Sequence, residues 1–329
     1  GVLLIFSFVA VKLSNSIGLI RVLGLHVLFL ITYLLLLLKL PEHSELFFII
    51  AGLSGIEAAF YWTPLNVLFV RHTKPKSMGS SYSKLIAIPK IASMFAPIVG
   101  AFIITNYGFT VLFGFAVILY ICSIIPLLSL KGEKTSFSFS YQKCKDIYQK
   151  NKRFVIPEII DNLAEDAMVL WSILIFIQLD SVVQVGGIQT VVGIAGVIFT
   201  LVVGKFSDRQ EIKHRLLRVG ALGVSVAWIL NYVIAITTIN PLYFYLGSVV
   251  ISFALKAFMI PYGSLLYNRA RTDDAQFLVL REIPTILGRQ ILFILVLLVL
   301  PKLELVFILV AIVFLYFVFF NTKRLEINK

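Results

Sequence analysis

The chain has 329 residues, of which 59% are hydrophobic, a mean hydropathy of +0.96 and a formal net charge of +12. Soluble globular domains are about 45–50% apolar, so this composition excludes an ordinary soluble protein and is typical of a polytopic membrane protein. The apolar runs last about 20 residues, which favours transmembrane helices and excludes a transmembrane barrel, whose strands alternate over about ten residues.

The predicted elements are helical spans, because backbone amides in lipid must be paired within their own segment. Residues 1–11 are expected to be the end of one span. Ten complete spans follow in chain order, at 22–38, 46–70, 85–105, 108–130, 159–179, 185–203, 219–239, 242–267, 283–300 and 303–320. The fold class predicted from this pattern is an all-α, polytopic membrane protein.

Basic residues alternate from loop to loop. The loops at 12–21, 71–84, 131–153, 205–218 and 269–281, together with 323–329, hold 24 Lys and Arg residues, and the alternate loops hold 2. This asymmetry predicts that the basic set is cytoplasmic. The positive charge is therefore explained by membrane topology, and we expect no nucleic-acid partner.

A short phrase occurs twice in the chain. Gly204-Lys-Phe-Ser-Asp208-Arg209 closes one span and opens a basic loop, and Val11-Lys-Leu-Ser-Asn15-Ser16 does the same 193 residues earlier. Ile88-Pro89 and Ile283-Pro284 form a further echo, 195 residues apart. Near-constant offsets predict two related halves, which is the pattern of a duplicated transporter bundle.

The repeat also predicts what precedes residue 1. The partner of span 159–179 falls before the chain begins, and the partner of span 185–203 is only partly present. We therefore expect a chain that lacks the first helix and part of the second helix of a twelve-helix protein with both termini in the cytoplasm.

The segment Gly204-Lys-Phe-Ser-Asp208-Arg209, followed by Lys213 and Arg215, resembles the cytoplasmic loop signature of the major facilitator superfamily. The resemblance covers the whole chain through its span count, central basic loop and repeat. It implies two pseudo-symmetric six-helix bundles, with an N-terminal bundle at 1–130, a cytoplasmic amphipathic linker at 131–157 and a C-terminal bundle at 158–329. The first copy of the signature has Val11 for Gly, Asn15 for Asp and Ser16 for Arg.

The loop signature predicts a gate built from Gly204, Asp208, Arg209, Arg215 and Arg269. Gly204 permits a tight exit from its helix. Asp208 can lie at a helix N-terminus, where it meets unpaired amides, or it can pair with Arg269 or Arg271 at a neighbouring helix end. Asn15 can cap a helix but carries no charge, so we expect an asymmetric gate with the stronger contact in the second half.

Ala96-Pro97-Ile98-Val99-Gly100-Ala101 resembles an element found in export-type members of the superfamily, although Ala replaces two of its glycines. Small residues in that position also make a helix-packing face. Both interpretations stay open, and export is slightly favoured over uptake.

Ionisable residues inside spans are costly and indicate functional sites. Asp161 and Glu165 are four residues apart and share one helix face, where two carboxylates raise each other's pKa and allow proton coupling. Lys90 or Arg289 could compete for that carboxylate pair, and Glu57 could pair with Lys256. The candidate substrate and coupling residues are Glu57, Asn66, Lys90, Asp161, Glu165, Asp166, Trp171, Lys256 and Arg289.

Other chemistry has little support. The two cysteines and four histidines have no metal-ligand spacing, and no phosphate-binding loop or catalytic triad pattern occurs. We expect no cofactor, no metal and no enzymatic activity. Tyr141, Cys144, Ile147 and Tyr148 predict a short amphipathic helix on the membrane surface.

The expected function is that of a secondary transporter in the plasma (inner) membrane. It would act as a monomer surrounded by lipids and move a small organic solute by alternating access, with protons as the coupling ion and with antiport and efflux favoured. One alternative is a lipid or lysolipid translocase on the same fold. Another, from a different class, is a membrane-embedded sensor or enzyme.

Overall fold

The computed structural model describes residues 1–130, 132–137, 140–300 and 302–325, without the side chains of 272–275, 323 and 324. Residue 131, where the predicted linker begins, lies outside this range. The described residues form helices and connecting segments with no β-strand. They divide into two compact units. Unit 1 comprises residues 1–72, 103–152 and 270–286, and unit 2 comprises residues 73–102, 153–269 and 287–329.

Unit 1 begins with three packed helices, α1 (Val2–Ile17), α2 (Leu19–Lys39) and α3 (Phe47–His72). The short η1 (Ser44–Leu46) leads into α3. Ala10, Val22, Ala59 and Phe60 form a buried core between them. Gly18 separates α1 from α2 with a φ of 90°, a conformation that is favourable only for glycine and so ends one helix before the next begins.

The next helices depart from the predicted boundaries. After η2 (Pro75–Ser77), helix α4 (Met78–Ser93) ends within the predicted span 85–105, and α5 (Ala96–Leu128) continues into the predicted span 108–130. Pro97 near the start of α5 has no amide to offer to the preceding turn, which accounts for the break. Gly108 has a φ of 80° and divides α5 into two helical pieces at the predicted span boundary.

The linker helix is α6 (Tyr141–Asn151), which is followed by η3 (Lys152–Phe154). Ile147 is buried, Cys144 is half-buried, and Tyr141 and Tyr148 are exposed. A short helix therefore lies where the amphipathic pattern predicts one.

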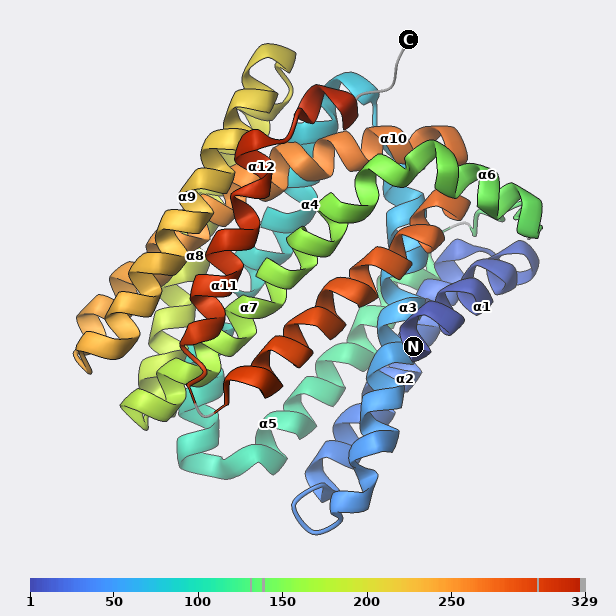
Figure 1. Cartoon of the computed structure of the whole chain (residues 1–329). Helices are drawn as coiled ribbons and strands as arrows, with labels where there is room; N and C mark the ends of the chain where they lie inside the picture. Colours follow the sequence, from blue (N-terminus) through green and yellow to red (C-terminus); the bar gives the residue numbers. More distant parts are fainter. Residues whose placement is uncertain (131, 138–139, 301, 326–329) are drawn as a thin grey trace. The chain divides into compact units, whose positions relative to one another are not determined.

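Unit 2 contains α4 and parts of α5 and α10, together with α7 (Val155–Leu179), α8 (Val182–Ser207), α9 (Gln210–Thr237), α11 (Leu305–Phe314) and α12 (Tyr316–Phe319). The short η4 (Thr322–Leu325) follows α12. Figure 1 shows α7, α8, α9 and α11 running alongside one another, and their residues are in contact. Trp171, Trp228 and Phe307 fill the centre of this helix group, with Trp228 stacked on Phe307 at 5.0 Å between ring centroids.

Helix α10 (Pro241–Val299) has 59 residues, which is too long for a single crossing of about 20 residues. Its two apolar parts, Pro241–Arg271 and Gln276–Val299, match two predicted spans. In the described part of the chain, seven segments are long and apolar enough to cross a membrane, and one of them, Pro75–Leu128, covers two predicted spans. With α7 and the shorter α11–α12 segment, they correspond in position to the ten predicted spans, as an all-α, polytopic membrane protein requires.

Candidate functional site

The Asp208 motif, residues 204–209, lies at the end of α8 and contacts the beginning of α4. Asp208 is the C-cap residue of α8. Its Oδ1 accepts hydrogen bonds from the Gly79 amide at 2.8 Å and the Ser80 amide at 3.2 Å. Its Oδ2 lies 3.3 Å from the same Ser80 nitrogen. Because these amides have no partner within their own helix, the carboxylate both caps α4 and meets the positive end of its dipole. Asp208 thus joins two helices that are 128 residues apart in the chain.

Two glycines allow the helices to come this close. A Cβ atom at Gly204 would overlap the side chain of Ser83 on α4, and a Cβ at Gly79 would lie 2.8 Å from that of Ser207. Gly204 is therefore required for contact between helices. The tight helix exit expected from the sequence is not formed there, because α8 continues past Gly204 to Ser207.

The basic residues of the predicted gate have other surroundings. Arg209 is exposed and lies over the Phe206 ring, with its guanidinium carbon 5.9 Å from the centroid, which is a cation–π arrangement. Arg215 is exposed on α9, and Arg269 is half-buried on α10. Arg271 donates to the carbonyl of Val70 at 3.3 Å, within unit 1. The sequence predicts that Asp208 caps a helix or pairs with Arg269 or Arg271. The structure contains the helix cap, on α4.

The Asn15 motif, residues 11–16, remains helical and contacts a different kind of partner. Its Asn15 Nδ2 donates to the Phe137 carbonyl at 2.7 Å, and its Oδ1 accepts from the Phe137 amide at 3.0 Å and from the Thr135 hydroxyl. The backbone of the segment that contains Phe137 is also bound by α2, because the Leu19 amide donates to the Glu133 carbonyl at 2.7 Å. Residues 132–137 therefore form a strap fixed across the end of α1 and the start of α2.

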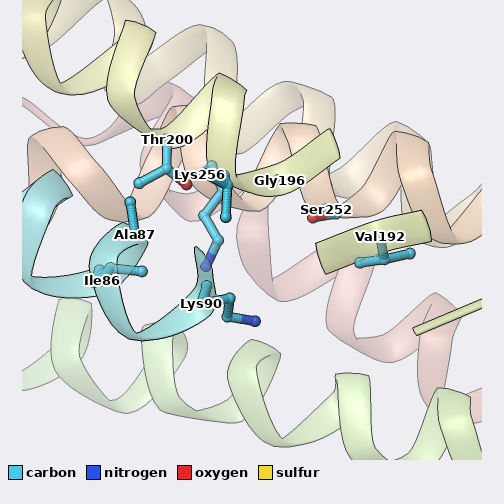
Figure 2. Close-up of a pocket in the computed structure, with 9 residues that line it drawn as sticks. Ile86, Ala87, Lys90, Val192, Gly196, Thr200, Ser252 and Lys256 are labelled. Carbon is cyan, nitrogen blue, oxygen red and sulfur yellow. The ribbon is translucent and has the colours of Figure 1, made fainter. Parts of the chain in front are cut away.

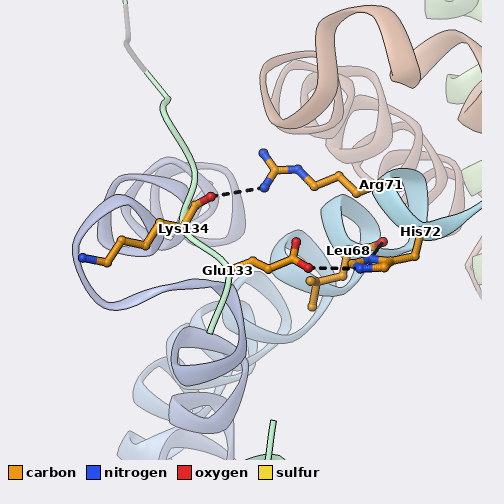
Figure 3. A network of polar contacts seen from close by, with 5 residues as sticks. All are labelled: Leu68, Arg71, His72, Glu133 and Lys134. Carbon is orange, nitrogen blue, oxygen red and sulfur yellow. Dashed lines mark hydrogen bonds and ion pairs between the residues drawn. The ribbon is translucent and has the colours of Figure 1, made fainter. Parts of the chain in front are cut away.

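The end of α3 holds the same strap from another side. Figure 3 shows Arg71 and His72 directed toward Glu133 and Lys134. Arg71 Nη1 donates to the Lys134 carbonyl at 3.3 Å, and His72 Nε2 lies 3.0 Å from Glu133 Oε1. Both pairs are largely exposed, so they position the strap without contributing much to stability.

The predicted charges of α7 are distributed over two faces of the helix. Asp166 Oδ2 forms an ion pair with Arg289 Nε on α10 at 3.4 Å. Glu165 is exposed, Asp161 is half-buried, and both interact electrostatically with Lys256. Arg289 thus pairs with Asp166, which lies on the stripe beside the Asp161–Glu165 pair.

A small pocket in unit 2 contains the two lysines that the sequence places inside spans. It is narrow, with a free volume of about 10 Å³, and it is lined by residues of α4, α8 and α10, namely Ile86, Ala87, Lys90, Val192, Gly196, Val197, Thr200, Ser252 and Lys256. Figure 2 shows the Lys256 side chain extending from α10 toward Lys90 on α4. On each helix these residues recur three or four apart, which places them on one face.

Glu57 and Asn66 lie in unit 1 on α3. Glu57 is half-buried, and in the described part of the chain it has neither an ion pair nor a hydrogen bond. Tyr61 lies one turn further along, 5.0 Å from the ring of His26 and 4.9 Å from that of Trp62. Asn66 is buried. Glu57 and Lys256 belong to different units, so the expected pairing between them stays a prediction.

Trp171 is buried in the core of unit 2. Its Nε1 donates to Ser248 at 2.8 Å, and its ring packs against Phe244 and Phe307. It does not line the lysine pocket, and a contact between Trp171 and substrate stays a prediction.

One buried carboxylate was missed by the sequence reasoning. Glu158 on α7 is 2% exposed, and its Oε2 accepts a hydrogen bond from Tyr262 on α10 at 2.7 Å. Asn162, one turn further along, donates to the Glu158 carbonyl at 2.8 Å. The spacing of Glu158 and Asn162 on one helix face was a usable signal, but Glu158 lies just outside the predicted span 159–179.

The small-residue element at Ala96–Ala101 packs against α8. A Cβ atom at Gly186 would lie 2.8 Å from the Pro97 carbonyl oxygen and 3.0 Å from the Ala101 Cβ. This close approach fits the helix-packing interpretation of the element.

Comparisons with a family model and with solved structures show what this chain is similar to. The model of the Major Facilitator Superfamily matches residues 2–279. A bacterial homologue of the iron transporter ferroportin, in an outward-facing state, is similar in fold with a TM-score of 0.61 and 17% identity over 96% of this chain and 88% of its own. The E. coli fucose:proton symporter has a TM-score of 0.67 and 12% identity over 98% of this chain and 88% of its own.

A human organic anion transporter has a TM-score of 0.62 and 14% identity, and the match covers 97% of this chain and 80% of that protein. A search of curated protein sequences found no match. At these identities the solved structures establish the fold alone.

Proposed function

The chain belongs to the major facilitator superfamily, and from this premise we propose that it is a secondary active transporter that moves a small organic solute across a membrane by alternating access. Members of the family are transporters, so transport itself follows at the family level. What we propose beyond the family is the class of solute, the coupling ion and the direction of transport.

The observation that carries the proposal is the contact of Asp208 with Gly79 and Ser80. It joins the end of α8, in the predicted second half of the repeat, to the beginning of α4, in the predicted first half. One carboxylate and two amides make a strong but small contact, which a rearrangement of the halves can break and form again. The topology predicts that this contact lies on the cytoplasmic side, and we propose that it helps to close that side in one state of the transport cycle.

Proton coupling is supported by carboxylates that lie within spans. Glu57 is half-buried on α3 with no charged partner among the described residues, and Glu165 lies near Lys256 without forming an ion pair with it. A carboxylate that has no fixed counter-ion can accept and release a proton as access alternates. We propose Glu57 or the Asp161–Glu165 pair as the coupling group, and export as the direction.

The test is flux in proteoliposomes under an imposed pH gradient. The full-length protein is reconstituted with labelled organic solutes of different charge. Its variants Glu57→Gln and Glu165→Gln are measured beside it, with Glu211→Gln, an exposed residue at the start of α9, as a matched control. We expect gradient-driven flux of at least one solute, its loss in one of the first two variants, and full flux in the control. Equal flux in all four proteins would exclude the assigned coupling groups.

The same vesicles distinguish a soluble substrate from a lipid substrate. We propose the plasma (inner) membrane as its location, with cytoplasmic termini and a monomeric protein. Movement of a labelled lysolipid between leaflets, without flux of any soluble compound, would favour the lipid translocase instead.

A further inference from the structure

The lysine pocket of unit 2 brings two ammonium groups together without a counter-ion. Lys90 on α4 and Lys256 on α10 both line it, and none of its nine lining residues is acidic. In the described part of the chain neither lysine forms an ion pair or a hydrogen bond. The Lys90 side chain is exposed and that of Lys256 is half-buried. Two like charges at this spacing repel each other, and an anion bound between them would reduce that repulsion.

Two carboxylates near the pocket also act on Lys256. Lys90 repels the Lys256 ammonium, and Glu165 and Asp161 attract it. Both carboxylates lie on α7, outside the lining. They moderate the positive potential around Lys256, but they do not occupy the space between the two lysines.

The polar groups of the pocket are those that an oxyanion requires. Thr200 on α8 and Ser252 on α10 contribute hydroxyls that have no hydrogen bond in the described part of the chain. Ammonium groups and hydroxyls are the donors that bind an oxygen atom of a carboxylate or a phosphate. The remaining lining residues are apolar or glycine.

The size of the pocket limits what it holds. The free volume between the lining residues is about 10 Å³, which is room for about one oxygen atom. The pocket therefore holds at most one oxygen of an anionic group, and the rest of a solute must lie outside it. Gly196 helps to form this narrow space, since a Cβ there would lie 3.2 Å from the Ser252 hydroxyl.

We propose that the pocket formed by Lys90, Lys256, Thr200 and Ser252 binds an oxyanion group of the transported solute, so that the substrate class is a small organic anion. The inference rests on the proposed transport function for the word substrate, but binding to the pocket is testable without transport.

The experiment measures ligand-induced thermal stabilisation of the full 329-residue chain in detergent at constant ionic strength. The probes are benzoate with its neutral counterpart benzamide, and phenyl phosphate with phenol. Inorganic phosphate is a further arm that separates binding of a free ion from binding of an organic anion. We expect benzoate or phenyl phosphate to raise the Tm in a saturable manner, and the neutral compounds to have no effect.

The variants connect this binding to the pocket. Lys90→Gln and Lys256→Gln should each weaken the apparent Kd of the anion at least about tenfold, whereas Lys256→Arg should keep it within about threefold. Lys84→Gln, on the exposed surface of the same helix as Lys90, should bind like the unmodified chain. Without ligand, the two Gln variants should unfold at the same or a higher temperature, because a like-charge contact is removed; a purely structural role for the lysines predicts a lower one.

Three results would overturn the proposal: no stabilisation by any anion, equal stabilisation by charged and neutral probes, or unchanged anion binding in both Gln variants. Stabilisation by inorganic phosphate as strong as that by phenyl phosphate would overturn the organic-anion class. Failure of the transport proposal gives a different pattern, in which vesicles show no flux while anion binding remains sensitive to both lysines.

Discussion

The two copies of the repeated motif differ by one atom at their central residue, and they bind different partners. Asp208 offers only acceptors, and it binds the two free amides at the start of α4. Asn15 offers a donor and an acceptor, and both are used by backbone atoms of Phe137. A carboxylate suits a helix N-terminus and a carboxamide suits an extended segment, so the side chain selects the partner.

The backbone of the two motifs also differs, because the helix ends at a different point in each. The chain leaves α8 at Asp208, but α1 continues through Asn15 to Ile17 before Gly18 ends it. The expected asymmetry between the copies therefore takes a physical form: the second copy connects two long helices, and the first copy holds the strap at 132–137. This comparison is sharpened by four predictions.

The largest effect is expected from Gly204→Ala. Because the new Cβ overlaps Ser83 on α4, we expect a loss of about 2–3 kcal/mol of stability, in the upper part of the range for overpacking. Thermal unfolding of the chain in detergent measures it. Gly24→Ala is the matched control, since no atom lies within 4 Å of a Cβ there and the change should be neutral or stabilising by up to about 1 kcal/mol. If both variants unfold at the same temperature, contact at Gly204 does not limit the approach of α8 to α4.

The second prediction concerns Asn15→Asp. This change removes the donor to the Phe137 carbonyl and places a carboxylate oxygen against it, so we expect a loss of about 1–2 kcal/mol. Limited proteolysis near residues 132–137 reports release of the strap. Asn15→Ser, which keeps a hydroxyl that donates and accepts, should release it less. A strap that is equally protected in both variants would show that its backbone contacts alone hold it.

The third prediction is the reverse change, Asp208→Asn. The amide oxygen can still accept from Gly79, but the charge at the start of α4 is lost, at a cost of about 0.3–1 kcal/mol. We expect a larger fraction of molecules to be open on the predicted cytoplasmic side, measured as faster alkylation of a cysteine introduced at Ser80. The Ser80 cysteine in an otherwise unchanged chain is the reference, and an unchanged rate would remove the latch role of Asp208.

The fourth prediction concerns labelling of the unmodified chain. It tests on which side of the membrane the strap and the neighbouring helix α6 lie. Burial raises the pKa of the Cys144 thiol, and the charge of Lys143 opposes this to a smaller extent. The thiolate fraction at neutral pH is therefore low, and the rate of maleimide labelling should keep rising above the ordinary thiol pKa. A membrane-impermeant maleimide should label Cys144 from the cytoplasmic side only.

Two variants serve as controls for this labelling. Cys122→Ser should leave the labelling unchanged, and Cys144→Ser should abolish it, because the Cys122 side chain lies within a span on α5. Labelling from the opposite side would invert the predicted topology.

Much of the fold was predictable from the apolar periodicity, since ten runs of about 20 residues correspond to helical segments. The break between Ser93 and Ala96 was not predicted, although Pro97 signals it. A hydropathy pattern is insensitive to a helix break that occurs within an apolar run, because both sides of the break remain apolar.

The site was less predictable than the fold. The sequence indicated Asp208, Lys90 and Lys256, because charges in spans and in loop signatures stand out. It could not indicate that Lys90 and Lys256 share a pocket, or that the cap of α4 is supplied by α8, because such pairs are separated by more than 120 residues. Glu158 was missed because its partner, Tyr262, becomes evident only when α7 and α10 are packed.

The aromatic packing of unit 2 has an optical consequence. The indoles of Trp171 and Trp228 are both buried against Phe307, whereas the third indole, Trp62 on α3, is 50% exposed. Brominated lipids quench fluorophores at the hydrocarbon boundary, so they should dim the emission of Trp62 and spare the other two. The intrinsic fluorescence of the protein therefore divides into a component that senses the bilayer and a component that senses the interior of one helix group.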